Sequence, residues 1–182
     1  MSGVGPAAAA ITVELALAST RSTVANLMEL YLYEFSDIDG RPIGPDGCYG
    51  YATLDAYWRE AGRYPFLVRV DGQLAGFALV IEHRILDGQS PGHLIAEFFV
   101  MRAHRRRGVG EAVAMRLFDR FPGPWWVSEH GGNVQALAFW RAVISRYTNG
   151  EFREEIWVEP DGTPCVAQRF ASQPTSKSGR HG

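Results

Sequence analysis

At 182 residues, with 46% hydrophobic and 21% charged residues, the chain has the size and composition of one globular domain with a substantial core. Its formal net charge of -2 and pI near 6.2 give no overall positive field, which argues against nucleic acid or an anionic membrane as a partner. No apolar run approaches the roughly 20 residues that span a bilayer, and no basic region precedes the first apolar stretch, so we expect a cytoplasmic protein.

The hydrophobic pattern predicts alternating strands and helices between a loose N-terminus, residues 1–10, and a disordered polar tail, residues 171–182. The first part of the chain is expected to form a strand at 11–18, a helix from 19 to about 35, a loop at 37–47 and a short helix near 54–61. Strands follow at 65–70, 74–83 and 93–101, with a loop at 87–92 before the third. The last part should form a helix at 108–121, a strand at 124–130, a turn at 131–133, a helix to about 147 and a hairpin at 151–170 that turns near 161–162.

This order, β-α-α-β-β-β-α-β-α-β-β, predicts an α+β fold in which helices flank a central mixed, mostly antiparallel sheet. One strand-helix-strand crossover interrupts the antiparallel order near the middle of the chain. The single domain is expected to cover residues 11–170. Cys48 and Cys165 form no metal-binding or redox motif, so we expect two free thiols, with a disulfide between them left open.

The crossover contains Arg105-Arg106-Arg107-Gly108-Val109-Gly110, which follows an apolar strand and begins a helix. Glycines allow the backbone to approach a ligand closely, and the first N–H groups of a helix lack internal partners. The arginines can add charged hydrogen bonds to phosphate oxygens. The segment therefore predicts a phosphate or pyrophosphate site, although a plain turn beside a solvated basic patch would give the same short pattern.

The segment AEFFVMRAHRRRGVG, together with NVQALAFW further along, resembles the GNAT acetyltransferases. Val100 precedes Arg105 by five residues, as in that superfamily, and the family's second motif, Asn-x-x-Ala-x-x-Phe-Tyr, is matched by Asn133, Ala136, Phe139 and Trp140. The predicted element order also matches the family fold over residues 11–170. The strand sequence EFFVM is similar to the corresponding segment of the spermidine/spermine acetyltransferases.

The resemblance implies an N-acetyltransferase that uses acetyl-CoA as co-substrate and needs no metal. It implies that the backbone of the predicted strand holds the acetyl carbonyl and pantetheine arm, that the glycine turn holds the pyrophosphate, and that Asn133, also a natural helix cap, contacts the pantetheine or acyl region. The residues expected to bind the co-substrate are Phe98, Phe99, Val100, Arg105, Arg106, Arg107, Gly108, Val109, Gly110, Asn133 and Trp140.

One departure from the family concerns the proton donor. Many members use the tyrosine of the second motif to protonate the leaving thiolate, and this chain has Trp140 there. An indole N–H can donate a hydrogen bond but is far too weak an acid to give up its proton near neutral pH, so either another group or water serves as the acid or the thiolate leaves unassisted. Trp140 also lies on an apolar stripe with Leu137 and Ile144, so a purely packing role stays open.

Glu97 is the first candidate for the catalytic base, because it lies on the strand expected to carry the acetyl group. A carboxylate within an apolar run is costly to bury alone, so it should face a cleft, water or a cationic substrate. An ordinary paired strand carboxylate is the alternative. The candidates held in reserve are Glu82, His83, Glu129 and His130.

The acceptor is expected to be the primary amine of a small molecule or peptide. The region before residue 60 is aromatic and would suit an amine with some apolar surface, or would simply pack the helices onto the sheet. Its residues are Tyr31, Tyr33, Tyr51, Tyr57 and Trp58, with Asp37 and Asp39 nearby. The competing hypothesis is a non-catalytic acetyl-CoA-binding module that acts as a sensor or interaction partner, and a homodimer is left open.

Overall fold

The computed structural model describes residues 9–84, 91–158 and 162–172 and contains a seven-stranded sheet of order β1-β2-β3-β4-β5-β7-β6. Its strands are β1 (Ile11–Leu15), β2 (Arg63–Val70), β3 (Gln73–Arg84), β4 (Pro91–Val100), β5 (Gly123–His130), β6 (Arg153–Val158) and β7 (Pro164–Ser172). All neighbours pair antiparallel except β4 and β5, which are parallel and are joined by the predicted crossover. The predicted α+β architecture is confirmed.

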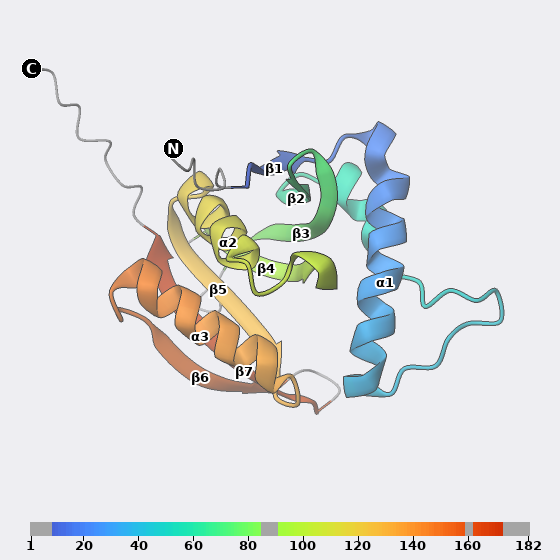
Figure 1. Ribbon diagram of the computed structural model, residues 1–182. Coiled ribbons are helices and arrows are strands. Elements are labelled where there is room, and N and C mark those ends of the chain that lie inside the picture. The colour runs from blue at the N-terminus through green and yellow to red at the C-terminus, as the bar shows by residue number, and fades with distance from the viewer. Residues whose placement is uncertain (1–8, 85–90, 159–161, 173–182) are drawn as a thin grey trace, which may run out of the picture.

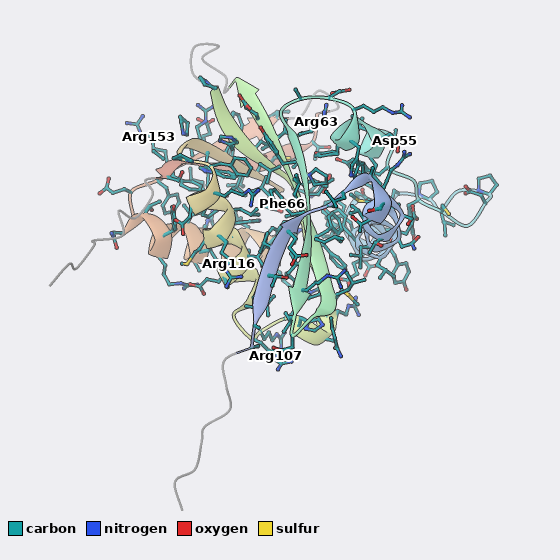
Figure 2. The ribbon with its side chains drawn as sticks, turned by 90° about the horizontal axis from the view of Figure 1, so that it is seen from above. Asp55, Arg63, Phe66, Arg107, Arg116 and Arg153 are labelled. Carbon is teal, nitrogen blue, oxygen red and sulfur yellow. The ribbon has the colours of Figure 1, made fainter. Side chains whose placement is uncertain are left out.

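Helices lie on both faces of this sheet. They are α1 (Arg21–Asp39), α2 (Val109–Arg120), α3 (Val134–Thr148) and the short 3-10 turns η1 (Ala18–Thr20), η2 (Leu54–Trp58) and η3 (Arg102–His104). Figure 1 shows α2 and α3 together in front of the sheet and α1 apart from them. In the view of Figure 2 the sheet separates α1 from α2 and α3, with Phe66 near the centre.

Each face of the sheet has its own hydrophobic cluster. Val113, Leu117 and Ile144 of α2 and α3 pack on one face with Phe66, and Val24, Met28 and Leu32 of α1 pack on the other with Leu79 of β3. The alternation of side chains along each strand assigns every residue to one of these faces. We call them the α2/α3 face and the α1 face.

Local sequence explains most element boundaries and three departures from the predicted ones. The helix α1 continues to Asp39, four residues past its predicted end, and Gly40 stops it with a left-handed φ of 69°. The polar, turn-forming character of residues 36–39 concealed this last turn. β1 is shorter than predicted and is followed by η1, and the second predicted helix is the single 3-10 turn η2.

The C-terminal boundary also differs from the expected one, because β7 continues through Ser172. The buried Ser172 hydroxyl donates to the Phe121 carbonyl over 2.9 Å, which ties this end of the strand to the end of α2. The predicted loop at 87–90, the first eight residues, Asp161 of the last turn and the tail from residue 173 lie outside the described residues. Cys48 and Cys165 form no disulfide with each other.

Candidate active site

The two parallel strands at the centre of the sheet separate before they end. β4 and β5 pair only at His93–Trp125, Leu94–Trp126 and Ile95–Val127, so the last residues of both strands have no partner across this boundary. We call this opening the fork. On its β3 side β4 stays paired through Val100, and the Met101 N–H still bonds the Ala75 carbonyl at 2.8 Å. The antiparallel ladder therefore turns the backbone groups of Phe98 and Val100 into the fork.

A β-bulge in β4 decides which way Glu97 points. Leu79 pairs with Glu97 but Val80 pairs with Ile95, which leaves Ala96 as an extra residue. Ile95 packs on the α2/α3 face, and simple alternation would place Glu97 on that face too. The extra residue turns Glu97 to the α1 face, the face of its neighbour Leu79.

The Glu97 carboxyl lies among aromatic side chains from the N-terminal third of the chain. Burial raises its pKa above the ordinary value, while hydrogen bonds from the hydroxyls of Tyr31 and Tyr51 and the charge of Arg41 act in the opposite direction. Burial and the nearby Glu97 charge also raise the pKa of Tyr57 and of both tyrosines that bond Glu97. The Glu97 carboxyl is therefore more basic than an ordinary glutamate, which is the property that a general base needs.

A second carboxyl, Glu129, lies across the fork on β5. Burial raises its pKa to about 7, opposed by a hydrogen bond from the Trp140 indole and reinforced by the charge of Glu97. Trp140 itself is 1% exposed and packs against Phe98, Phe118 and Phe139, so its packing role is real. Its indole N–H also donates the hydrogen bond to the Glu129 carboxyl.

The glycine turn has the geometry of an anion-binding loop. Arg106 and Gly108 both have left-handed φ values, 59° and 75°, and such residues direct successive backbone N–H groups to one side. The first N–H groups of α2 follow directly, with no side-chain cap from Gly108. Gly110 allows close packing, because a Cβ there would lie 3.1 Å from the Phe139 ring and would push against it.

The three arginines of the turn differ in their partners. Arg105 points back to β4 and α1: its Nε donates to the Val100 carbonyl at 2.6 Å, and its Nη2 lies 2.7 Å from the Glu34 carboxylate. The exposed Arg106 and Arg107 are left for an anion at the turn, and Figure 2 shows Arg107 at the edge of the molecule. In this conformation the turn offers its backbone and two side chains, and the guanidinium of Arg105 holds the strand end.

Some of the remaining predicted site residues lie at the fork and others lie away from it. Asn133 caps α3, its Oδ1 accepting from the Ala136 N–H at 3.1 Å, so the capping role holds. His130 lies at the fork against the Phe35 ring, with its Nδ1 accepting from the Gly132 N–H. Glu82 lies away from this group and accepts from the Tyr64 hydroxyl at 3.3 Å. The His83 side chain lies outside the described structure.

Only part of the aromatic region faces Glu97. Tyr31, Tyr51 and Tyr57 interact with it, whereas Trp58 donates to the Ala16 carbonyl at 2.9 Å and has a structural role. Tyr33 is 64% exposed and lines a pocket of about 280 Å³ between α1 and the end of β4. The pocket's other lining residues are Leu30, Glu34, Phe99, Met101, Arg102 and Ala103.

Asp39 pairs with Arg41 at the end of α1, while Asp37 is exposed. Within residues 9–84, 91–158 and 162–172, no three His, Cys, Asp or Glu side chains are grouped to hold a metal ion. In the same part of the chain, no helix is long and apolar enough to cross a membrane.

Sequence reasoning ranked Glu129 only as a reserve and did not identify Tyr31 and Tyr51 as partners of Glu97. A signal for Glu129 was present in the sequence, because it follows the apolar run of β5 as Glu97 interrupts that of β4. The structure adds that both lie two residues beyond the last pair, Ile95–Val127. The tyrosines carried no such signal, because aromatic residues on helices and loops most often serve packing.

Solved structures with the same fold include several acetyltransferases. The ribosomal-protein-S18-alanine N-acetyltransferase from Escherichia coli aligns at TM-score 0.54 and 16% identity, over 93% of this chain and 98% of its own. The yncA protein from Salmonella typhimurium, with its cofactor acetyl-CoA, aligns at 0.60 and 14%, over 91% and 96%. The spermidine N-acetyltransferase from Vibrio cholerae, in complex with CoA and spermine, aligns at 0.58 and 12%, over 89% and 95%. No match was found among curated proteins.

These features define an acyltransferase that uses a CoA thioester: the sheet forks, a glycine turn stands at a helix N-terminus, and a buried carboxyl lies at the fork. The model of the acetyltransferase (GNAT) family matches residues 26–143, and the chain belongs to this family. It is an acetyl-CoA-dependent N-acetyltransferase, and the predicted resemblance is confirmed.

Proposed function

We propose that the chain transfers an acetyl group from acetyl-CoA to a primary amine of a small molecule or peptide, by direct attack of the amine on the thioester. The observation that carries this proposal is the position of Glu97 at the mouth of the fork. The backbone of Phe98 to Val100 would hold the thioester there, and the turn at 105–110 would hold the pyrophosphate. A buried carboxyl with a raised pKa is suited to take a proton from an ammonium group.

The surroundings of Glu97 favour a cationic acceptor with some apolar surface. Three tyrosine rings and two carboxyls face the region, and aromatic faces attract cations. Spermidine and an alanine amine of a ribosomal protein, named for two structural neighbours, both fit this description. Arg41 near Glu97 would also tolerate an acceptor that carries a carboxylate, so the panel of acceptors should include amino acids.

The test is CoA release, followed with a thiol reagent, over polyamines, amino acids, peptides with free N-termini and aminoglycosides. The exposed Cys48 thiol reacts with the same reagent, so a Cys48→Ser variant supplies the background correction. Acetyl-CoA and dephospho-CoA should each raise the melting temperature, and pantetheine should do so weakly because it lacks the pyrophosphate.

The alternative is a CoA-binding module without activity, and the buried Trp140 in place of a tyrosine is the observation that favours it. A clear rise in melting temperature with CoA, without CoA release for any amine class, would support that alternative. Acceptor-dependent CoA release would exclude it.

A further inference from the structure

Acetyl transfer from a thioester to an amine moves protons at two separate places. The ammonium of the acceptor must lose a proton before attack, and the departing sulfur is helped by gaining one. Glu97 accounts for the first. Trp140 occupies the position from which many family members supply the second, and an indole N–H cannot release its proton near neutral pH.

Glu129 has the geometry for this second role. It lies two residues beyond Val127, and Glu97 lies two residues beyond Ile95, the opposite member of the last β4–β5 pair. Strand alternation puts Glu129 on the α2/α3 face with Val127, and the bulge puts Glu97 on the α1 face. The two carboxyls therefore meet the fork from opposite faces of the sheet.

The α2/α3 face is also the face of the co-substrate machinery. The glycine turn leads into α2. Trp140 lies on α3, and its indole N–H donates a hydrogen bond to Glu129. The α1 face carries the aromatic side chains around Glu97. Glu129 thus lies on the side of the acetyl donor, and Glu97 lies on the side of the amine acceptor.

We propose that Glu129, held by the indole of Trp140, is the catalytic residue that protonates the departing CoA sulfur, and so replaces the tyrosine that this chain lacks. The inference rests on the proposed function. It predicts that the chain needs both carboxyls, one ionised on the acceptor side and one protonated on the donor side.

Protons are conserved over the whole transfer. The ammonium gives one proton to the Glu97 carboxylate, and the neutral amine forms the N–C bond. As the C–S bond breaks, its electron pair goes to sulfur, which takes the Glu129 proton. The second proton of the new amide nitrogen, acidic once the bond has formed, passes to the Glu129 carboxylate. The products are the amide and the CoA thiol, and the Glu97 proton leaves to solvent.

The surroundings of Glu129 bring the titration of its carboxyl close to neutral pH. The Trp140 indole on α3 donates a hydrogen bond to it, and the charges of the Glu97 carboxyl on β4 and the Tyr31 hydroxyl on α1 interact with it across the fork. Its register partner on β7 is the apolar Val166. Burial and the Glu97 charge raise its pKa to about 7, which suits a donor that must be protonated and still release its proton.

The experiment compares Glu129→Gln with wild type and with Glu151→Gln, a matched change at an exposed carboxylate. With an acceptor for which wild type is active, Glu129→Gln should lower kcat by about 100-fold while CoA still raises the melting temperature. Glu151→Gln should keep the wild-type kcat. Adding Trp140→Tyr to Glu129→Gln should restore activity at least about tenfold, because a phenol then stands in the family's position.

Two further measurements separate a proton donor from a structural residue. With an aryl ester as acetyl donor, whose leaving group is a stable anion, Glu129→Gln should approach the wild-type rate. The melting temperature of wild type should fall between pH 5 and pH 8 more than that of Glu129→Gln.

A Glu129→Gln kcat within about twofold of wild type would overturn the inference, as would an equal loss with both donors or an unchanged pH dependence of melting. Failure of the proposed function would look different, because wild type itself would then release no CoA with any amine.

Discussion

Replacing Glu129 by glutamine is expected to stabilise the folded chain at neutral and alkaline pH. Below the ordinary carboxyl pKa of 4.5, Glu129 is protonated in both the folded and the unfolded chain and costs nothing. As pH rises, the unfolded chain loses this proton first, because the folded chain holds it until about pH 7. Stability therefore falls with rising pH through this window.

The size of the effect follows from the two pKa values. The gap between 4.5 and about 7 corresponds to about 3 kcal/mol of unfolding free energy once both states are ionised. About 2 to 3 kcal/mol of this should be lost between pH 5 and pH 8. A glutamine keeps the shape and the hydrogen bond to Trp140 without the ionisation.

Urea unfolding at pH 5, 6, 7 and 8 measures this directly for wild type, Glu129→Gln and Glu151→Gln. The free energies of wild type and Glu151→Gln should decline in parallel, and that of Glu129→Gln should decline less. Glu97 also has a raised pKa and contributes a decline of the same sign, so some slope will remain. Parallel curves for wild type and Glu129→Gln would refute the reasoning, since the carboxyl would then titrate alike in both states.

Three other substitutions test the rest of the site. Gly108→Glu, at a φ of 75° with open space around it, should retain the fold and lower CoA affinity at least about tenfold by calorimetry, and unchanged affinity would reject the pyrophosphate assignment. Glu97→Gln should lower kcat/KM about 100-fold with CoA binding intact, and the loss should shrink as pH rises because more amine is already neutral; a wild-type rate at neutral pH would remove Glu97 from the mechanism. Trp140→Ala should cost about 3–5 kcal/mol in urea unfolding, and a loss below about 1 kcal/mol would contradict its burial in the core.

The parts of the site that follow short-range rules could be predicted from the sequence. The glycine turn follows an apolar strand and opens a helix, and Asn133 stands where a helix cap belongs, so local chemistry places both. Glu97 was identified because a lone carboxylate interrupts an apolar run. The role of Arg105 could not be inferred this way, because its partner Glu34 lies 71 residues away on α1.

The face of the sheet to which Glu97 points could not be predicted from the sequence. A bulge can be recognised in a sequence only where apolar and polar residues alternate and the extra residue breaks that alternation. The run around it, Leu94-Ile95-Ala96 and Phe98-Phe99, is apolar on both faces and gives no period from which an extra residue could be detected. A shift of one residue moves each later side chain to the other face. Without the bulge, Glu97 would join Glu129 on the α2/α3 face, and two buried like charges would oppose each other's ionisation. With it, Glu97 lies among the tyrosines of the acceptor side and Glu129 lies beside Trp140, where burial and the charge of Glu97 raise its pKa to about 7. The proposed division of acid and base between the two faces thus depends on a single extra residue, Ala96, in β4.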